Sequence, residues 1–154
     1  AGRLGGAVAG DAGVHIGSTA AVVAHCYPVT RPGRGGKGVA TSVGQVLVGF
    51  PVYFPIDAAV AIATAALPFW KARAFAATAT ASVVWIAATG VWVARDLPNA
   101  WGPKPSRPLI VGAVVSSAVI AERFIAAERK HRSPGSPDEG ASRAQPSRIR
   151  STNA

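Results

Sequence analysis

This chain has few charged residues, and acidic residues are especially scarce. Charged residues make up 15% of its 154 residues, against about 25% in an ordinary soluble domain. Acidic side chains number 7 against 16 Lys and Arg, while hydrophobic residues reach 49% and the mean hydropathy is +0.29. This balance argues against an ordinary soluble domain and indicates a membrane protein with a polar tail.

Cysteine is nearly absent and methionine is wholly absent. The single cysteine, Cys26, excludes an intrachain disulfide, and no cysteine–histidine spacing suggests zinc, so we expect neither a metal nor another cofactor. We interpret Cys26 as a small apolar residue at a helix end rather than as a catalytic thiol. Because methionine is missing even at position 1, we expect natural sequence upstream of Ala1.

Aromatic residues do not alternate with the basic ones, although the net charge is +9 and the pI is about 11.1. A base-stacking platform needs such aromatic residues, so we expect no nucleic-acid partner. The basic residues lie instead between apolar runs and in the tail, a distribution typical of contact with anionic lipid headgroups. The lipid bilayer is therefore the expected partner.

Four apolar runs predict an all-α fold: a polytopic membrane helical bundle with about three to four spans in this chain. Crossing a bilayer takes roughly 20 apolar residues, and the run 74–94 provides them without a single charge. The other apolar runs are 13–29, 39–67 and 109–121.

The run 39–67 contains residues that interrupt a membrane helix. Pro51 and Pro55 predict that it is kinked or broken near its middle. Asp57 lies in the same region. An acid inside an apolar run is by default a functional candidate, and a position at a kink near the membrane surface is the alternative interpretation.

The last apolar run extends to Ala127 if Glu122 and Arg123 face the protein or reach the membrane surface. Beyond it, the composition changes to Ser, Pro, Gly, Arg and Glu. We therefore expect a membrane domain over 1–127 and a disordered basic tail over 128–154.

The segment GRGGKGVAT, residues 33–41, has the composition of a phosphate-binding turn at a membrane face. Its glycines let backbone N–H groups approach an anion closely, and Lys37 adds a point charge. A helix beginning at Val39 would present its first N–H groups to the same anion. Arg31 and Arg34 raise the local positive potential. Every loop between the apolar runs carries more Lys and Arg than acid, and this loop holds the richest basic cluster among them, so we place it in the cytoplasm.

Two other interpretations of the loop follow from its chemistry. A nucleotide P-loop requires GxxxxGK followed by Ser or Thr. With Gly36 and Lys37 as the GK pair, the leading glycine falls at Arg31 and Gly38 occupies the hydroxyl position, so the pattern fails twice. A flexible basic loop that only contacts lipid headgroups remains open on chemistry alone.

The residues around this loop resemble the central motif of the bacterial PlsY family, the integral-membrane acyl-phosphate:glycerol-3-phosphate acyltransferases. That motif is Gly-His-x-Phe-Pro followed by Phe-x-Gly-Gly-Lys-Gly-Val-Ala-Thr. This chain has AHCYP over 24–28 and GRGGKGVAT over 33–41, with the expected separation between His25 and Gly35. The departures from the motif are Ala24, Tyr27 and Gly33.

The resemblance implies acyl transfer from acyl phosphate to the 1-hydroxyl of glycerol 3-phosphate, giving lysophosphatidic acid for phospholipid biosynthesis. It also implies a multi-pass protein of the bacterial plasma membrane. Carried over residue by residue, it implies His25 and Lys37 as catalytic residues, with no covalent nucleophile because acyl phosphate is already activated. The residues implied to bind substrate phosphate are Arg34, Gly35, Gly36, Lys37, Gly38 and Thr41.

Two further family motifs are incomplete here. An early motif rich in Ser, Gly, Asn and Arg would lie before Ala1. A late motif contains His-x-x-Asn-Ile-x-Arg: if Arg123 takes the arginine place, Ser117 replaces the histidine and Ile120 the asparagine. Two hypotheses therefore stand. The chain is an acyltransferase, truncated at its N-terminus and diverged toward its C-terminus, or it is a catalytically inactive membrane protein that keeps the loop to bind phosphate or lipid headgroups.

Overall fold

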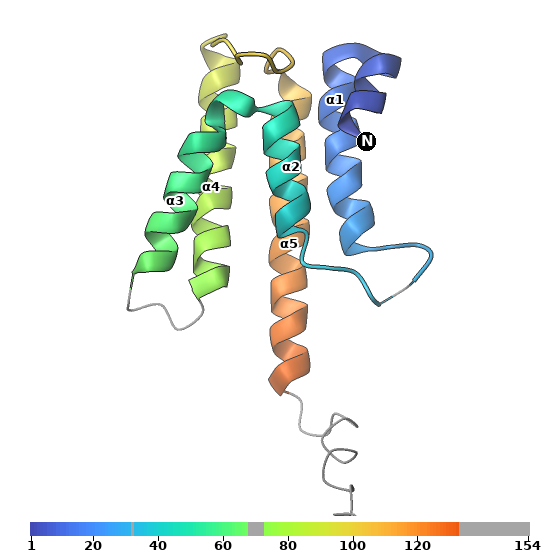
Figure 1. The fold of residues 1–154 in the computed structure, drawn as a ribbon, viewed down its shortest axis with the longest axis vertical. Coiled ribbons are helices and arrows are strands. Elements are labelled where there is room, and N and C mark those ends of the chain that lie inside the picture. Colours follow the sequence, from blue (N-terminus) through green and yellow to red (C-terminus); the bar gives the residue numbers. More distant parts are fainter. Residues whose placement is uncertain (32, 68–72, 133–154) are drawn as a thin grey trace, which may run out of the picture.

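The structure, a computed structural model, describes residues 1–31, 33–67 and 73–132, and all regular elements in these ranges are helices. The elements in chain order are α1 (Gly2–Cys26), α2 (Val39–Gly49), the 3-10 helix η1 (Pro51–Tyr53), α3 (Phe54–Ala66), α4 (Arg73–Ala94) and α5 (Arg107–Arg132). Figure 1 shows the connection between α1 and α2 toward the lower end of the bundle, and η1 and the connection 95–106 at the upper end.

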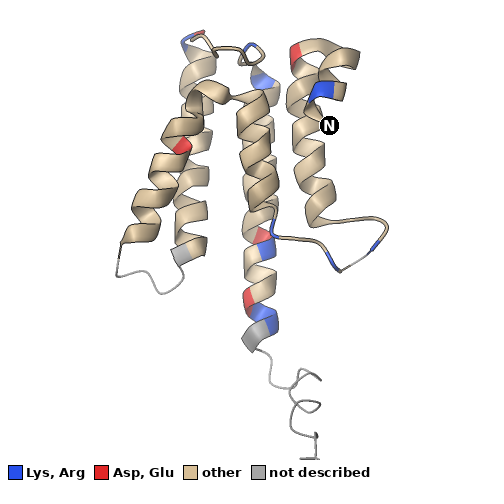
Figure 2. Ribbon diagram, viewed as in Figure 1, with Lys and Arg blue, Asp and Glu red and all other residues tan. Residues whose placement is uncertain are grey.

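In the part of the chain that the structure describes, three helices are long and apolar enough to cross a membrane: α1, Ala74–Ala94 of α4, and Arg107–Lys130 of α5. The bent pair made by α2 with η1 and α3 counts as a fourth if it is one broken span. Charged positions gather toward the two ends of the bundle, and the helical surfaces between them are almost free of charge (Figure 2). The predicted all-α membrane bundle with three to four spans is confirmed.

Helix α1 contains a sharp break that the sequence analysis does not predict. Ala9 (φ −137°, ψ 27°) and Gly10 (φ 57°, ψ −147°) leave the helical region, and the segment before them folds back along the segment after them (Figure 1). The positive φ at Gly10 favours glycine. The helix ends where Tyr27 precedes Pro28, because proline disfavours helical backbone in the residue before it.

Residues 39–67 form two helices that turn back on each other. The axis of α2 and that of η1 with α3 differ by 116°. The turn lies at Phe50 (φ −147°, ψ 57°), directly before Pro51. Phe50 and Tyr53 are fully buried there, and their rings stack with centroids 5.3 Å apart. The predicted break is confirmed, and as its consequence α3 returns beside α4 (Figure 1).

Helix α5 contacts both α1 and α4, and it contributes residues to two clusters of buried side chains in the described part of the chain. The larger cluster consists of Val46, Phe50, Tyr53, Trp85, Leu109 and Ala113. The smaller one consists of Val22, Cys26 and Ile120. Cys26 is the last residue of α1 and is 1% exposed, which confirms its interpretation as a small apolar residue at a helix end.

Helix α5 continues past the expected limit at Ala127 and ends at Arg132. The first residues of the predicted tail, 128–132, are therefore helical. The remainder of the predicted disordered tail, 133–154, lies outside the described residues.

The connection 95–106 depends on a buried side chain. Asn99 is 5% exposed, and its amide nitrogen donates to the carbonyl oxygens of Gly49 (3.0 Å) and Pro103 (2.7 Å). It thereby ties the end of α2 to the connection between α4 and α5.

Asn99→Ala leaves these two carbonyl oxygens without their donor, so we expect it to lower the free energy of unfolding by about 1–3 kcal/mol. The measurement is the thermal unfolding midpoint in detergent. Lys104→Ala is the control, since it removes an ion pair with Asp96 whose side chains are 68% and 71% exposed, and such pairs contribute about 0–1 kcal/mol. Equal midpoints for Asn99→Ala and the unmodified chain would contradict this role of Asn99.

Candidate functional site

The connection between α1 and α2 turns back onto the end of α1. Two backbone hydrogen bonds of 3.2 Å close successive turns, from the Arg31 N–H to the Pro28 carbonyl and from the Arg34 N–H to the Arg31 carbonyl. The Gly36 N–H then donates to the carbonyl oxygen of His25, also at 3.2 Å. The glycine segment is therefore attached to the last turn of α1.

This return requires glycine at positions 35, 36 and 38. A Cβ added to Gly35 would overlap the carbonyl oxygen of Cys26. A Cβ added to Gly36 would overlap Nε2 of the His25 imidazole. Gly38 has a φ of +82°, and a Cβ there would come within 2.6 Å of the Cys26 Sγ. Since Gly38 is also the N-cap of α2, its left-handed conformation sets the direction in which α2 leaves the loop. The His25 ring consequently lies against the glycine segment.

Arg123 of α5 holds the loop from the other side. Its Nη2 donates to the Gly35 carbonyl oxygen (2.8 Å) and its Nε to the Gly36 carbonyl oxygen (3.3 Å). Its guanidinium carbon also lies 5.5 Å from the centroid of the Tyr27 ring. In a trans peptide the carbonyl and the following N–H point in opposite directions. The contact with Gly36 therefore turns the Lys37 N–H away from Arg123.

Backbone donors are left available on the loop. Within the described ranges, the N–H groups of Gly35, Lys37 and Gly38 form no hydrogen bond; Gly35 and Lys37 are at least partly exposed, whereas Gly38 is buried. The first N–H groups of α2, from Val39 onward, follow directly and carry the positive end of the helix dipole. Gly36 differs from its neighbours because its N–H is already bonded to α1. The loop can thus offer an anion several amide donors, with Gly36 acting as the anchor.

Lys37 supplies the positive charge beside these amides. Its side chain is exposed, and Nζ lies 4.6 Å from the centroid of the Phe124 ring on α5. A cation over an aromatic face is held weakly, and among the described residues no acidic side chain pairs with it. Its charge is therefore free to meet an incoming phosphate.

The predicted site residues do not all come together. His25, Gly35, Gly36, Lys37 and Gly38 meet at the end of α1, and Arg34 is exposed on the preceding turn. Thr41 is half-buried and instead lines a pocket of about 240 Å³ between α1 and α2 with Ser18 and Gln45.

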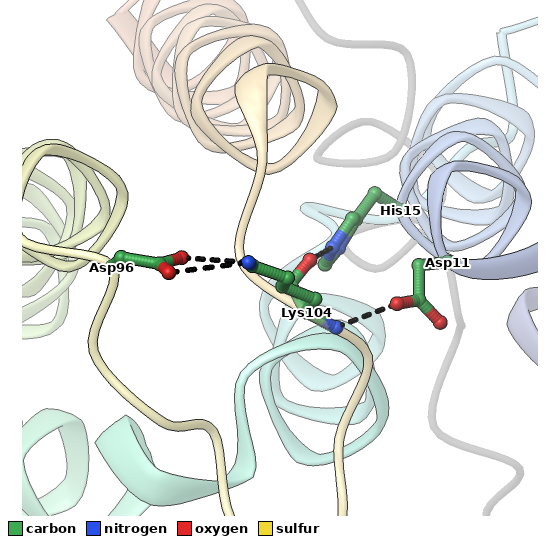
Figure 3. A network of polar contacts seen from close by, with 4 residues as sticks. All are labelled: Asp11, His15, Asp96 and Lys104. Atoms are coloured by element: carbon green, nitrogen blue, oxygen red, sulfur yellow. Dashed lines mark hydrogen bonds and ion pairs between the residues drawn. The ribbon is translucent and has the colours of Figure 1, made fainter.

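A second polar cluster lies at the opposite end of the bundle (Figure 3). The Lys104 backbone N–H donates to Asp11 (2.9 Å), and its Nζ lies 3.0 Å from Asp96. The buried His15 ring lies 3.5 Å from the Lys104 carbonyl oxygen. This network joins α1 to the connection 95–106 and contains none of the predicted site residues. Across the described ranges, no three His, Cys, Asp or Glu side chains gather as a metal site would require.

Sequence reasoning identified Arg123 only as the arginine of an incomplete motif. The signal was a charged pair, Glu122 and Arg123, at the end of the apolar run 109–121, but the contact of Arg123 with the loop could not be read from spacing. Phe124 and Tyr27 carry no such signal, because aromatic residues are common in apolar runs. Ile120, in the place of the motif asparagine, is 2% exposed and packs with Val22 and Cys26.

Comparisons with known proteins agree with one another. The family model described as Glycerol-3-phosphate acyltransferase matches residues 4–132. Curated relatives named glycerol-3-phosphate acyltransferase include proteins of Syntrophotalea carbinolica (45% identical over 64 residues, 42% of this chain and 31% of the relative) and Laribacter hongkongensis (40% over 75 residues, 47% of this chain and 37% of the relative). A third, from Solidesulfovibrio magneticus, is 48% identical over 46 residues, 30% of this chain and 23% of the relative. The matched segments thus span little more than a third of these relatives at most. No solved structure matches the chain.

Replacing Arg123 by leucine should release the glycine loop, because two charge-assisted hydrogen bonds to its carbonyl oxygens are lost. Each such bond contributes about 1.5–3 kcal/mol, so we expect trypsin to cleave after Arg34 and Lys37 at least about tenfold faster. Cleavage of the purified protein in detergent, followed by mass spectrometry, is the measurement. Arg107→Leu, at the other end of α5, should leave the rate unchanged. Equal cleavage rates in both variants would mean that Arg123 does not hold the loop.

Proposed function

This chain belongs to the glycerol-3-phosphate acyltransferase family, and on that premise we propose that it transfers an acyl group from acyl phosphate to the 1-hydroxyl of glycerol 3-phosphate. The product is lysophosphatidic acid, an intermediate of phospholipid synthesis. The observation that carries the proposal is the glycine loop at one end of a membrane bundle. There the N–H groups of Gly35, Lys37 and Gly38, which form no hydrogen bond with any described residue, lie beside the Lys37 ammonium. Both proposed substrates carry phosphate, which these donors suit.

The location of the loop supports this pair of substrates. Glycerol 3-phosphate is soluble, whereas the acyl chain of the donor is held in the bilayer, so the two meet at the membrane surface. The loop lies toward one end of helices that are long enough to cross the membrane. We place this end at the cytoplasmic face of the bacterial plasma membrane, on the argument of its basic residues Arg31, Arg34 and Lys37.

The proposed reaction forms one carbon–oxygen bond, breaks another and transfers one proton. The 1-hydroxyl oxygen attacks the acyl carbonyl carbon, the bond from that carbon to the phosphate oxygen breaks, and phosphate leaves with the bonding electron pair. The hydroxyl proton passes to the imidazole of His25, which is exposed and lies against Gly36. Lys37 and the free amides bind substrate phosphate. Positioning and charge stabilisation then supply the catalysis, because acyl phosphate is already activated.

A second candidate function is phosphate or lipid-headgroup binding without catalysis. It is favoured by the two substituted motif positions: Ile120 is buried in an apolar cluster, and the Ser117 hydroxyl is buried with no partner among the described residues. Under this alternative the loop would bind glycerol 3-phosphate, but no lysophosphatidic acid would form.

We expect Lys37→Ala to lower the formation of lysophosphatidic acid by about 10- to 100-fold, because one charge-assisted phosphate contact is lost. The assay supplies palmitoyl phosphate and radiolabelled glycerol 3-phosphate to the protein in nanodiscs. Arg95→Ala is the matched control. It removes an exposed charge at the end of the bundle opposite the glycine loop and should retain full activity.

Turnover that is unchanged by Lys37→Ala would contradict the phosphate role of this loop. Binding of glycerol 3-phosphate without product in the unmodified chain would favour the second candidate.

A further inference from the structure

An apolar cavity of about 400 Å³ lies between α2, α3, α4 and α5. Its walls include Val39, Ala77, Ala81, Trp85, Ile120 and Phe124. A smaller chamber of about 190 Å³ shares Thr78, Ser82, Ile120 and Phe124 with it. Four helices thus surround a space that is lined mainly by small and aromatic side chains.

One end of this cavity lies at the glycine loop. Val39, the first residue of α2, follows the loop directly and lines the cavity. Phe124 lines it too, and the same ring lies under the Lys37 ammonium at 4.6 Å. A ligand with its polar head at Lys37 therefore has an apolar chamber directly beneath that head.

The other end is closed by Trp85. Both Ala74 and Trp85 of α4 line the cavity, and a helical rise of 1.5 Å per residue places them roughly 16 Å apart along the axis. Trp85 is 4% exposed and belongs, with Phe50 and Tyr53, to the larger buried cluster. Asp57, in the first turn of α3, also lines the cavity and is unfavourable for a hydrocarbon chain. The chamber is thus mainly apolar and ends at Trp85 along α4, while it opens sideways where Ile62 of α3 is 70% exposed.

We propose that this cavity binds the acyl chain of the donor, with Trp85 setting the longest chain that fits; the inference rests on the proposed acyltransferase function. The chain enters beside Val39 and Phe124, and its reactive carbonyl stays near Lys37 and His25. An anionic head at Lys37 and a straight hydrocarbon tail complement the charge of the loop and the apolar lining of the cavity.

A second apolar groove, of about 740 Å³, lies between α1 and α5 and includes Ile16, Ala20 and Val111. It is bordered by two helices and the loop rather than by four helices, and Lys37 and Phe124 do not line it. We assign it to ordinary membrane lipid, and it provides the matched control.

We expect the length of the cavity, rather than the burial of additional CH₂ groups, to determine which acyl chains bind. The donor arrives from the bilayer, whose interior is as apolar as the cavity, so burial of each additional CH₂ gives little gain. A chain too long for the space must displace packed side chains, a change that typically weakens binding between about 5- and 150-fold. The residue at the closed end therefore determines the upper limit of chain length.

The first experiment locates the chain without any turnover. Palmitic acid with a diazirine at its methyl end is photolysed with the protein in nanodiscs of phosphatidylethanolamine and phosphatidylglycerol. We expect labelling of the α4 segment around Ala81 and Trp85, and we expect Ala81→Phe to lower it about tenfold because the ring fills the cavity. Ala20→Phe makes the same change in the α1–α5 groove and should leave the labelling of α4 unchanged. Labelling confined to the groove around Ala20 and Val111 would overturn the assignment.

The second experiment measures the chain-length limit by competition of unlabelled fatty acids of graded length against the same probe. Trp85→Phe should raise the limit and Ala81→Phe should lower it. These opposite directions separate an effect on the cavity from a loss of folding. A limit that neither variant moves would overturn the role of Trp85. If labelling follows this pattern but no lysophosphatidic acid forms in any assay, the cavity assignment stands and the proposed acyltransferase function fails.

Discussion

The hydrogen bond from the Gly36 N–H to the His25 carbonyl is the contact on which the functional end of this molecule depends. It brings a basic loop back onto the helix that precedes it. The absence of side chains at positions 35 and 36 leaves room for this approach to the Cys26 carbonyl and the His25 ring. The same return exposes both glycine carbonyl oxygens to Arg123. Among the described residues, it leaves the N–H groups of Gly35 and Lys37 without a hydrogen-bond partner beside a positive charge. Successive peptide groups of one short segment thus divide two roles: anchoring to α1 and Arg123, and the anion binding that we propose.

The sequence predicted features that depend on local chemistry. Apolar runs of sufficient length predicted the spans, and prolines predicted the break in 39–67 because proline removes a helical donor. The fold-back of α1 at Gly10 was not predictable, since glycine is also tolerated within membrane helices. The contact of Arg123 with the loop joins residues 87 and 88 positions apart in the chain. Such long-range pairing leaves no periodic pattern in a sequence, so the candidate site could be predicted only in part.

The two ends of the bundle differ in their polar groups. Polar contacts around Asn99 and Lys104 close the upper end and join connections that would otherwise be held only by apolar packing. At the lower end, within the described residues, the N–H groups of Gly35 and Lys37 form no hydrogen bond, and the exposed Lys37 ammonium has no acidic partner. Helix α5 connects the two ends, since Leu109 belongs to the larger buried cluster and the Phe124 ring contacts the Lys37 ammonium.

The most direct test of this account is the ¹⁵N NMR spectrum of the labelled protein in micelles as glycerol 3-phosphate is added. If the loop binds phosphate through its free amides, the resonances of Gly35, Lys37 and Gly38 shift in a saturable way. The Gly36 resonance shifts least, because its N–H is already bonded to α1. Shifts that are largest at the opposite end, around Gly102, or absent from the loop would contradict the central claim.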